Sequence, residues 1–73
     1  MGFKNVKDMN ELRLIIIARR LQKNMTQHDL SKKSGIPQAT ISHIENYHVK
    51  LNLGTLFKCL EALDMDFQLQ GRD

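Results

Sequence analysis

The sequence has 73 residues, with 11 Lys/Arg, 8 Asp/Glu and one cysteine, and its net charge is +3 at pH 7. This length predicts a single domain, residues 1–73, whose small core would gain stability from a second subunit. One cysteine excludes an internal disulfide, the apolar run "LRLIII" is far shorter than the roughly 20 residues that span a membrane, and no signal-peptide layout precedes it. We therefore expect a cytoplasmic protein with no membrane contact.

The charge is unevenly distributed along the chain. Residues 1–50 carry nine Lys/Arg against four Asp/Glu, whereas residues 51–73 carry two against four. A basic N-terminal part suggests a polyanion as partner. Ordinary solubility charge is the alternative explanation, and charge alone does not separate the two.

The first predicted helix covers residues 9–22. Asp8 and Glu11 have the spacing of a helix-capping pair, with Asp8 as the N-cap and Glu11 reaching back. The dipeptide "KN" at 23–24 ends the helix. The residues that follow the cap at helical spacing are Leu12, Ile15, Ile16 and Arg19.

Two shorter helices are predicted over residues 27–34 and 37–46. Thr26 and Asp29 have the spacing of a capping box at the start of the first one. Pro37 suits the first position of the second helix, where its missing N–H costs nothing.

The short link between these helices has the spacing of a helix-turn-helix, over about residues 26–46. That motif needs a small residue where the helices press together, a residue that tolerates positive φ in the turn, and apolar residues that lock the two helices. The residues at these positions are, in the same order, Ser31; Gly35; and Leu30, Ile36, Ile41 and Ile44. All of them comply, so the sequence predicts a helix-turn-helix here.

The C-terminal third predicts one more helix and a strand. Asn52 can cap a helix over residues 53–63, and residues 65–70 alternate between apolar and polar side chains, which is typical of a strand. The apolar stripe of this helix consists of Leu53, Leu56, Phe57, Leu60 and Leu63. The apolar face of the strand consists of Met65, Phe67 and Leu69.

A lone strand leaves its N–H and C=O groups unpaired, so it needs a partner. The favoured partner is the same strand of a second subunit, which gives an antiparallel two-stranded ribbon and a two-fold homodimer. Its apolar face would then cover Leu60 and Leu63. The alternative is pairing with residues 2–6 of the same chain, where Gly2 and Asn5 are poor strand formers.

The helix over 37–46 has a polar but acid-poor surface, as expected of a recognition helix in the major groove of DNA. The candidates for base contacts are Gln38, Ala39 and His43. Those for phosphate contacts on this helix are Thr40, Ser42 and Asn46. Glutamine can offer a donor and an acceptor to one adenine. His43 could instead be a plain surface histidine.

The stretch "MTQHDLSKKSGIPQATISHIEN" resembles the helix-turn-helix of the Cro and phage-repressor (XRE-type) family, and the resemblance covers residues 12–63. It implies an all-α, lambda-repressor-like domain of four to five helices, to which the ribbon would be added. It also implies that Gln27 contacts a phosphate and that Arg20 and Glu45 form an ion pair.

One subfamily is closer still. "QATISHIEN" and the tail "TLFKCLEALDMDFQLQ" are similar to HipB-type antitoxins, although His43 stands where an amide is expected. This resemblance implies a dimeric repressor that autoregulates its operon at a palindromic operator in double-stranded DNA. It also implies a HipA-like Ser/Thr kinase toxin as a protein partner.

Two alternatives remain: an XRE-type regulator without a toxin, and a protein-binding adaptor that does not read bases. An enzyme is disfavoured because the sequence contains no nucleophile–base pair, paired carboxylates or glycine-rich phosphate loop. The three histidines and Cys59 form no recognisable metal site, so we expect no cofactor, and no small-molecule substrate. Cys59 is interpreted as a buried hydrophobe, and His28 and His48 as neighbours of solvent or phosphate.

Overall fold

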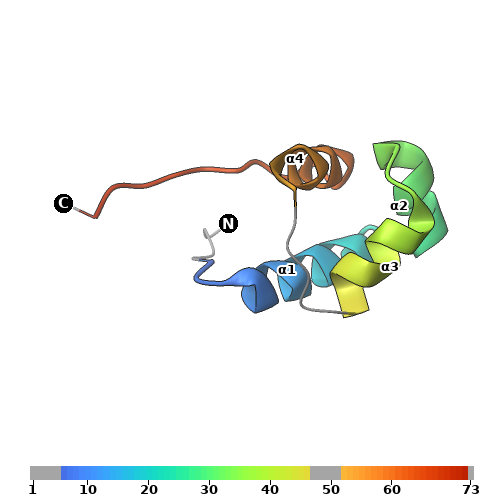
Figure 1. Cartoon of the computed structure of the whole chain (residues 1–73), viewed down its shortest axis with the longest axis horizontal. Coiled ribbons are helices and arrows are strands. Elements are labelled where there is room, and N and C mark those ends of the chain that lie inside the picture. Colours follow the sequence, from blue (N-terminus) through green and yellow to red (C-terminus); the bar gives the residue numbers. More distant parts are fainter. Residues whose placement is uncertain (1–5, 47–51, 73) are drawn as a thin grey trace.

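The computed structural model describes residues 6–46 and 52–72, and within them it contains four α-helices and no strand. The helices are α1 (Met9–Gln22), α2 (Gln27–Ser34), α3 (Gln38–Asn46) and α4 (Leu53–Ala62). Figure 1 shows α2 and α3 together at one end of the molecule, while the C-terminal segment leaves α4 in the opposite direction. No helix in these two ranges is long and apolar enough to cross a membrane.

The predicted starts of α1, α2 and α4 are confirmed by their capping bonds. The Asp8 side chain accepts from the backbone N–H of Glu11, and Thr26 and Asp29 form a complete capping box. Asn52 caps α4 through the N–H groups of its first turn. One detail differs, because the Glu11 carboxylate reaches back to the N–H of Lys7, at 2.7 Å, and not to that of Asp8.

Two helices end in the same way, with a residue in the left-handed conformation. Asn24 follows α1 with φ of 56°, and Asp64 follows α4 with φ of 55°. In both cases the next residue is a methionine whose N–H bonds back into the helix, Met25 to Arg20 at 3.0 Å and Met65 to Leu60 at 2.9 Å. Both methionines pack against the core, as the apolar residue after a Schellman motif usually does.

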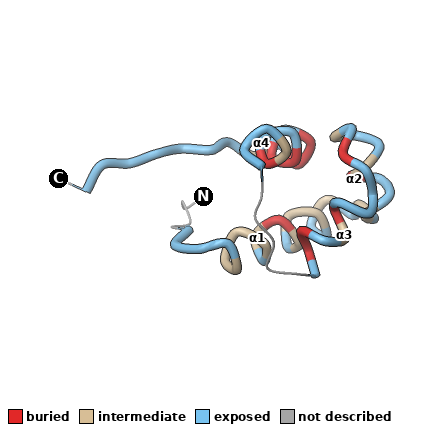
Figure 2. Tube along the Cα trace, viewed as in Figure 1, coloured by how far each residue is buried: buried red, intermediate tan, exposed pale blue. Residues whose placement is uncertain are grey.

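The core forms where the four helices face one another, as the buried stretches in Figure 2 show. Its buried apolar residues are Ile16, Leu30, Ile36, Ile41, Ile44, Leu56, Cys59, Leu60, Ala62 and Leu63. All four apolar positions of the helix-turn-helix pattern belong to this set, so that prediction is confirmed. Arg19 ties α1 to the end of α4, because its Nε donates to the carbonyl of Leu63 at 2.9 Å.

Cys59 is a buried hydrophobe, as predicted, with 1% of its surface exposed. Burial raises the pKa of its thiol to about 11, and the nearby charge of Glu45 adds to the effect. Because only the thiolate is a strong nucleophile, this thiol is chemically inert in the folded protein.

Three sequence-based predictions about the helices need correction. Helix α3 starts at Gln38, since Pro37 lies in the cap position and its carbonyl accepts from Ile41 at 3.1 Å. Helix α4 ends at Ala62, one residue before the predicted end at Leu63. Leu53 and Phe57, expected to point inward, are 65% and 50% exposed, so they lie on the side of α4 that faces away from the core.

The strand predicted over residues 65–70 is absent from the structure of the single chain. Met65 is instead part of the helix end, and the residues after it are exposed. A strand needs a neighbour to bond with, and the described part of the chain offers none. The alternative neighbour, residues 2–6, and the loop with His48 lie almost entirely outside the described residues.

Gly35, in the turn between α2 and α3, should not tolerate a β-carbon. Its φ is +77°, although a Cβ would meet nothing within 4 Å. The cost of Gly35→Ala is therefore conformational, and we expect chemical denaturation to show a loss of about 1–2 kcal/mol in unfolding free energy.

Two variants serve as controls for that measurement. Gly35→Asn should lose less, since asparagine enters the left-handed region more readily. Gly71→Ala, which is also unhindered and lies in the tail, should leave stability unchanged. A Gly35→Ala protein as stable as the wild type would contradict the argument.

Candidate nucleic-acid interface

The turn between α2 and α3 is fixed by side chains as well as by its glycine. The Ser31 hydroxyl donates to the carbonyl of Ile36, and the N–H of Ile36 donates to the Ser34 hydroxyl at 3.1 Å. Ser31 was expected only to be small enough for close packing, and the structure gives it this second role. The two helices are therefore held in a rigid relative orientation.

Helix α3 presents most of its polar residues to solvent. The exposed residues of this helix are Gln38, Ala39, Thr40, His43 and Asn46. Ser42 is half-buried and accepts a hydrogen bond from the Asn46 amide at 3.0 Å. The two ends of the helix thus differ: Gln38, Ala39 and Thr40 of the first turn are all exposed, whereas near the C-terminal end Ser42 is half-buried and bonded to Asn46.

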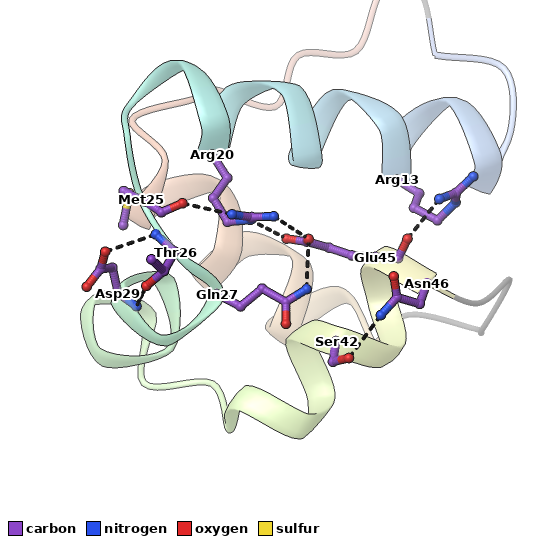
Figure 3. A network of polar contacts seen from close by, with 9 residues as sticks. All are labelled: Arg13, Arg20, Met25, Thr26, Gln27, Asp29, Ser42, Glu45 and Asn46. Carbon is purple, nitrogen blue, oxygen red and sulfur yellow. Dashed lines mark hydrogen bonds and ion pairs between the residues drawn. The ribbon is translucent and has the colours of Figure 1, made fainter.

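The one acidic side chain of α3, Glu45, is buried and surrounded by donors (Figure 3). Arg20 of α1 bonds it with two nitrogens, Nε to Oε2 and Nη2 to Oε1, both at 2.8 Å. The amide nitrogen of Gln27 donates to Oε1 at 3.1 Å. The ion pair that the family resemblance implied is therefore present, and Gln27 belongs to the same network.

The arginines of α1 also hold backbone groups. Arg20 uses its third nitrogen, Nη1, to donate to the carbonyl of Met25 at 2.8 Å. Arg13 donates to the carbonyl of Glu45 at 2.8 Å and to the Asn10 side chain at 2.8 Å (Figure 3 shows the contact with Glu45). The C-terminal end of α3 is thus anchored through both the side chain and the backbone of one residue.

The surroundings of Arg20 favour its charged form. The hydrogen bond to Glu45 raises the pKa of Arg20, burial opposes this, and the charge of Glu45 adds to the rise. Because the carboxylate is neutralised inside the protein, it does not oppose a polyanion at the surface.

Gln38, at the start of α3, contacts α2. Its amide oxygen lies 3.3 Å from Nδ1 of His28. Sequence reasoning interpreted His28 only as a neighbour of solvent or phosphate, and it missed Arg13 altogether. The contact of His28 with Gln38 and that of Arg13 with the carbonyl of Glu45 join residues ten or more positions apart. No local spacing could therefore have pointed to them.

The described residues contain no group of three or more His, Cys, Asp or Glu side chains placed to hold a metal ion. What the site offers is an exposed, uncharged helix tip on a rigid base. Such a surface can donate and accept hydrogen bonds, and it lacks the acidic groups that would repel phosphates.

Comparison with known proteins gives three similarities. A model of the helix-turn-helix family matches residues 16–70. Antitoxin HipB of Escherichia coli strain K12 is 38% identical over 69 residues, which cover 94% of this chain and 78% of that protein. A chain of the HipA-HipB-O2-O3 complex has a TM-score of 0.88 at 35% identity, covering 97% of this chain and 100% of that chain.

A further solved structure is a variant of the restriction-modification controller protein C.Esp1396I bound to its highest affinity operator site OM. Its TM-score is 0.75 at 31% identity, with 80% of this chain and 76% of that chain covered. The similarity to HipB therefore extends over nearly the whole chain, and the similarity to the controller protein over four-fifths of it.

Removing the Glu45 carboxylate should strongly destabilise the fold. The side chains of Arg20 and Glu45 are 12% and 3% exposed, so Glu45→Ala leaves a largely buried guanidinium without its counter-ion. We expect a loss of about 3–5 kcal/mol in unfolding free energy, measured by chemical denaturation.

The matched control is Glu61→Ala, which removes an exposed acid from α4. It should change stability by less than about 0.5 kcal/mol. Equal stabilities of the two variants would show that the Arg20–Glu45 pair does not hold the helices together.

Proposed function

Because this chain belongs to the helix-turn-helix family and, within it, to the HipB antitoxins, we propose that it is a sequence-specific DNA-binding repressor and the antitoxin of a HipA-like kinase toxin. It acts by binding and not by catalysis, and it represses its own operon from the cytoplasm.

The observation that carries this proposal is the exposed first turn of α3 on a rigid base. In helix-turn-helix proteins the N-terminal residues of the second helix contact base edges in the major groove. Gln38, Ala39 and His43 are exposed on that helix and are assigned to the bases. The amide of Gln38 matches an adenine, and the methyl of Ala39 suits a thymine methyl.

Phosphate contacts would come from both helices of the motif. On α3, the residues assigned to DNA phosphates are Thr40, Ser42 and Asn46. The hydrogen bond between Ser42 and Asn46 sets how these two side chains are presented. Gln27 is assigned to a phosphate at the start of α2. Its amide nitrogen uses one hydrogen on Glu45, so a second remains for a phosphate oxygen.

A homodimer is supported by exposed apolar side chains on α4 and the tail. Phe67 packs edge to face on Phe57, with ring centroids 5.7 Å apart, and both remain about half exposed. Leu53 and Leu69 are 65% and 87% exposed, which is costly in water unless another surface covers them. These exposed side chains, Leu53, Phe57, Phe67 and Leu69, make up the proposed dimer face.

In this dimer the tails of two subunits, residues 65–70, pair as an antiparallel ribbon. Met65 faces its own core, and Phe67 faces Phe57, whereas the sequence had suggested Leu60 and Leu63 as the covered residues. Two-fold symmetry puts two α3 helices into major-groove segments about 34 Å apart, so the operator is a palindrome or nearly so.

A HipA-like Ser/Thr kinase is the proposed protein partner. The support is the similarity to HipB over nearly the whole chain, including a HipB that was solved together with HipA. The alternative, a regulator without a toxin, predicts no HipA-like reading frame next to this gene. A HipA-like reading frame in that place supports the antitoxin role.

Gln38→Ala should weaken binding to the operator by about 1–3 kcal/mol and relax the preference at one base pair, since it removes a two-point contact to a base. Gln27→Ala should weaken binding to all sequences alike, because phosphate contacts carry no sequence information. Binding-site selection followed by titration on the selected DNA measures both effects.

Salt dependence distinguishes this function from that of an adaptor that does not read bases. DNA binding should weaken steeply between 50 and 200 mM salt, by about a hundredfold or more if several phosphates are contacted. A protein with unchanged base preferences after Gln38→Ala would contradict the assignment of Gln38, and one without salt-dependent DNA binding would contradict the function itself.

Shortening the chain after Asp66 should abolish the dimer, because it removes Phe67 and Leu69 but keeps Met65 on the core. Sedimentation at micromolar concentration should show a monomer, and the affinity for a palindromic site should fall with it.

The matched control is Leu21→Asp, which alters an exposed leucine of α1 outside the proposed dimer face. That variant should remain dimeric. A shortened chain that also remains dimeric would rule out the ribbon as the dimer contact.

A further inference from the structure

The contact between His28 and Gln38 joins a residue of α2 to the tip of the recognition helix. The amide oxygen of Gln38 lies 3.3 Å from Nδ1 of His28. An amide oxygen can only accept a hydrogen bond, so this contact requires that Nδ1 carries the proton. In the tautomer that carries the proton on Nδ1, His28 therefore bonds the oxygen of the Gln38 amide and not its nitrogen.

Both side chains start from fixed backbone. His28 lies in the first turn of α2, which the capping box of Thr26 and Asp29 closes. Gln38 is the first residue of α3, directly after Pro37, and the turn before it is bonded through Ser31 and Ser34. The separation of the two backbone positions is thus set by the motif itself.

The neighbours of His28 are engaged elsewhere. The Asp29 carboxylate accepts from the N–H of Thr26 at 2.9 Å, and the Thr26 hydroxyl accepts from the N–H of Asp29 at 3.0 Å. The Gln27 amide donates to Glu45. In this turn of α2, His28 is the side chain that contacts Gln38.

We propose that His28 determines base specificity by holding the amide of Gln38 in one orientation. With its oxygen toward α2, the Gln38 amide presents donor and acceptor to the groove in a fixed order. An A·T pair and a T·A pair offer their groups in opposite order across the major groove, so a fixed amide favours one of them. His28 is a positioning residue and acts through Gln38.

This inference rests on the proposed DNA-binding function, and it is tested by binding-site selection with His28 variants of the full chain. His28→Leu removes the donor, so the preference at the base pair read by Gln38 should fall by about five- to tenfold, at the lower end of the range that one two-point contact provides. His28→Asn offers an amide N–H in place of Nδ1–H and should restore the preference.

The double variants decide whether His28 acts through Gln38. In a Gln38→Ala background, His28→Leu should have no further effect on base preference. A second decrease in that background would mean that His28 reads the DNA itself, and it would overturn the proposal.

The free protein gives a readout without DNA. Nitrogen NMR of the imidazole at mildly alkaline pH should show the Nδ1–H tautomer of His28 in the wild type and a shift away from it in Gln38→Ala. The same tautomer distribution in both proteins would overturn the proposal.

Two failures remain distinguishable. A wild-type protein with no base preference would overturn the DNA-binding function together with this inference. A His28→Leu protein that keeps the wild-type preference, on DNA whose recognition depends on Gln38, would overturn the role of His28 alone.

Discussion

The carboxylate of Glu45 accepts three hydrogen bonds from two other helices, and the position of α3 depends on them. Arg20 of α1 donates to both of its oxygens, and Gln27 of α2 donates to Oε1, which therefore accepts two hydrogen bonds. A buried charge of this kind is tolerated only when it is paired and hydrogen-bonded, so the three helices cannot shift independently of one another. Arg13 adds a bond to the backbone of the same residue, which fixes the end of α3 farthest from its exposed tip.

This arrangement also explains the chemical character of the exposed face. The acid of α3 is buried and neutralised, and the side chains left at the surface are amides, hydroxyls, a methyl and an imidazole. Such groups can approach phosphates without repulsion and can still distinguish donors from acceptors. The helix needs both a rigid attachment to the core and hydrogen-bonding side chains on its exposed face. A recognition helix that changes its orientation cannot favour one base over another.

The C-terminal part of the molecule differs from the helix-turn-helix in that it leaves apolar side chains exposed. Helix α4 leaves Leu53 and Phe57 exposed, and Phe57 packs against Phe67 of the tail, so apolar side chains of both segments stay uncovered in one chain. The left-handed Asp64 and the bonds of Arg19 and Lys23 to the end of α4 set the direction in which the tail leaves. A chain of this size with an uncovered apolar surface is better suited to a dimer than to a monomer.

Local chemistry sufficed to predict α1 and α2 to the residue, the caps at Asp8, Thr26 and Asn52, and the left-handed Gly35. These features depend on groups within about four positions of one another, so spacing alone reveals them. The exposed side of α4, the bonds of Arg13 to α3 and the contact of His28 with Gln38 were decided only by the tertiary structure. These features depend on positions far apart in the sequence, whose separation is set by how the helices pack. The tail alternates with a period of two residues, but it cannot form a strand until a second strand lies beside it.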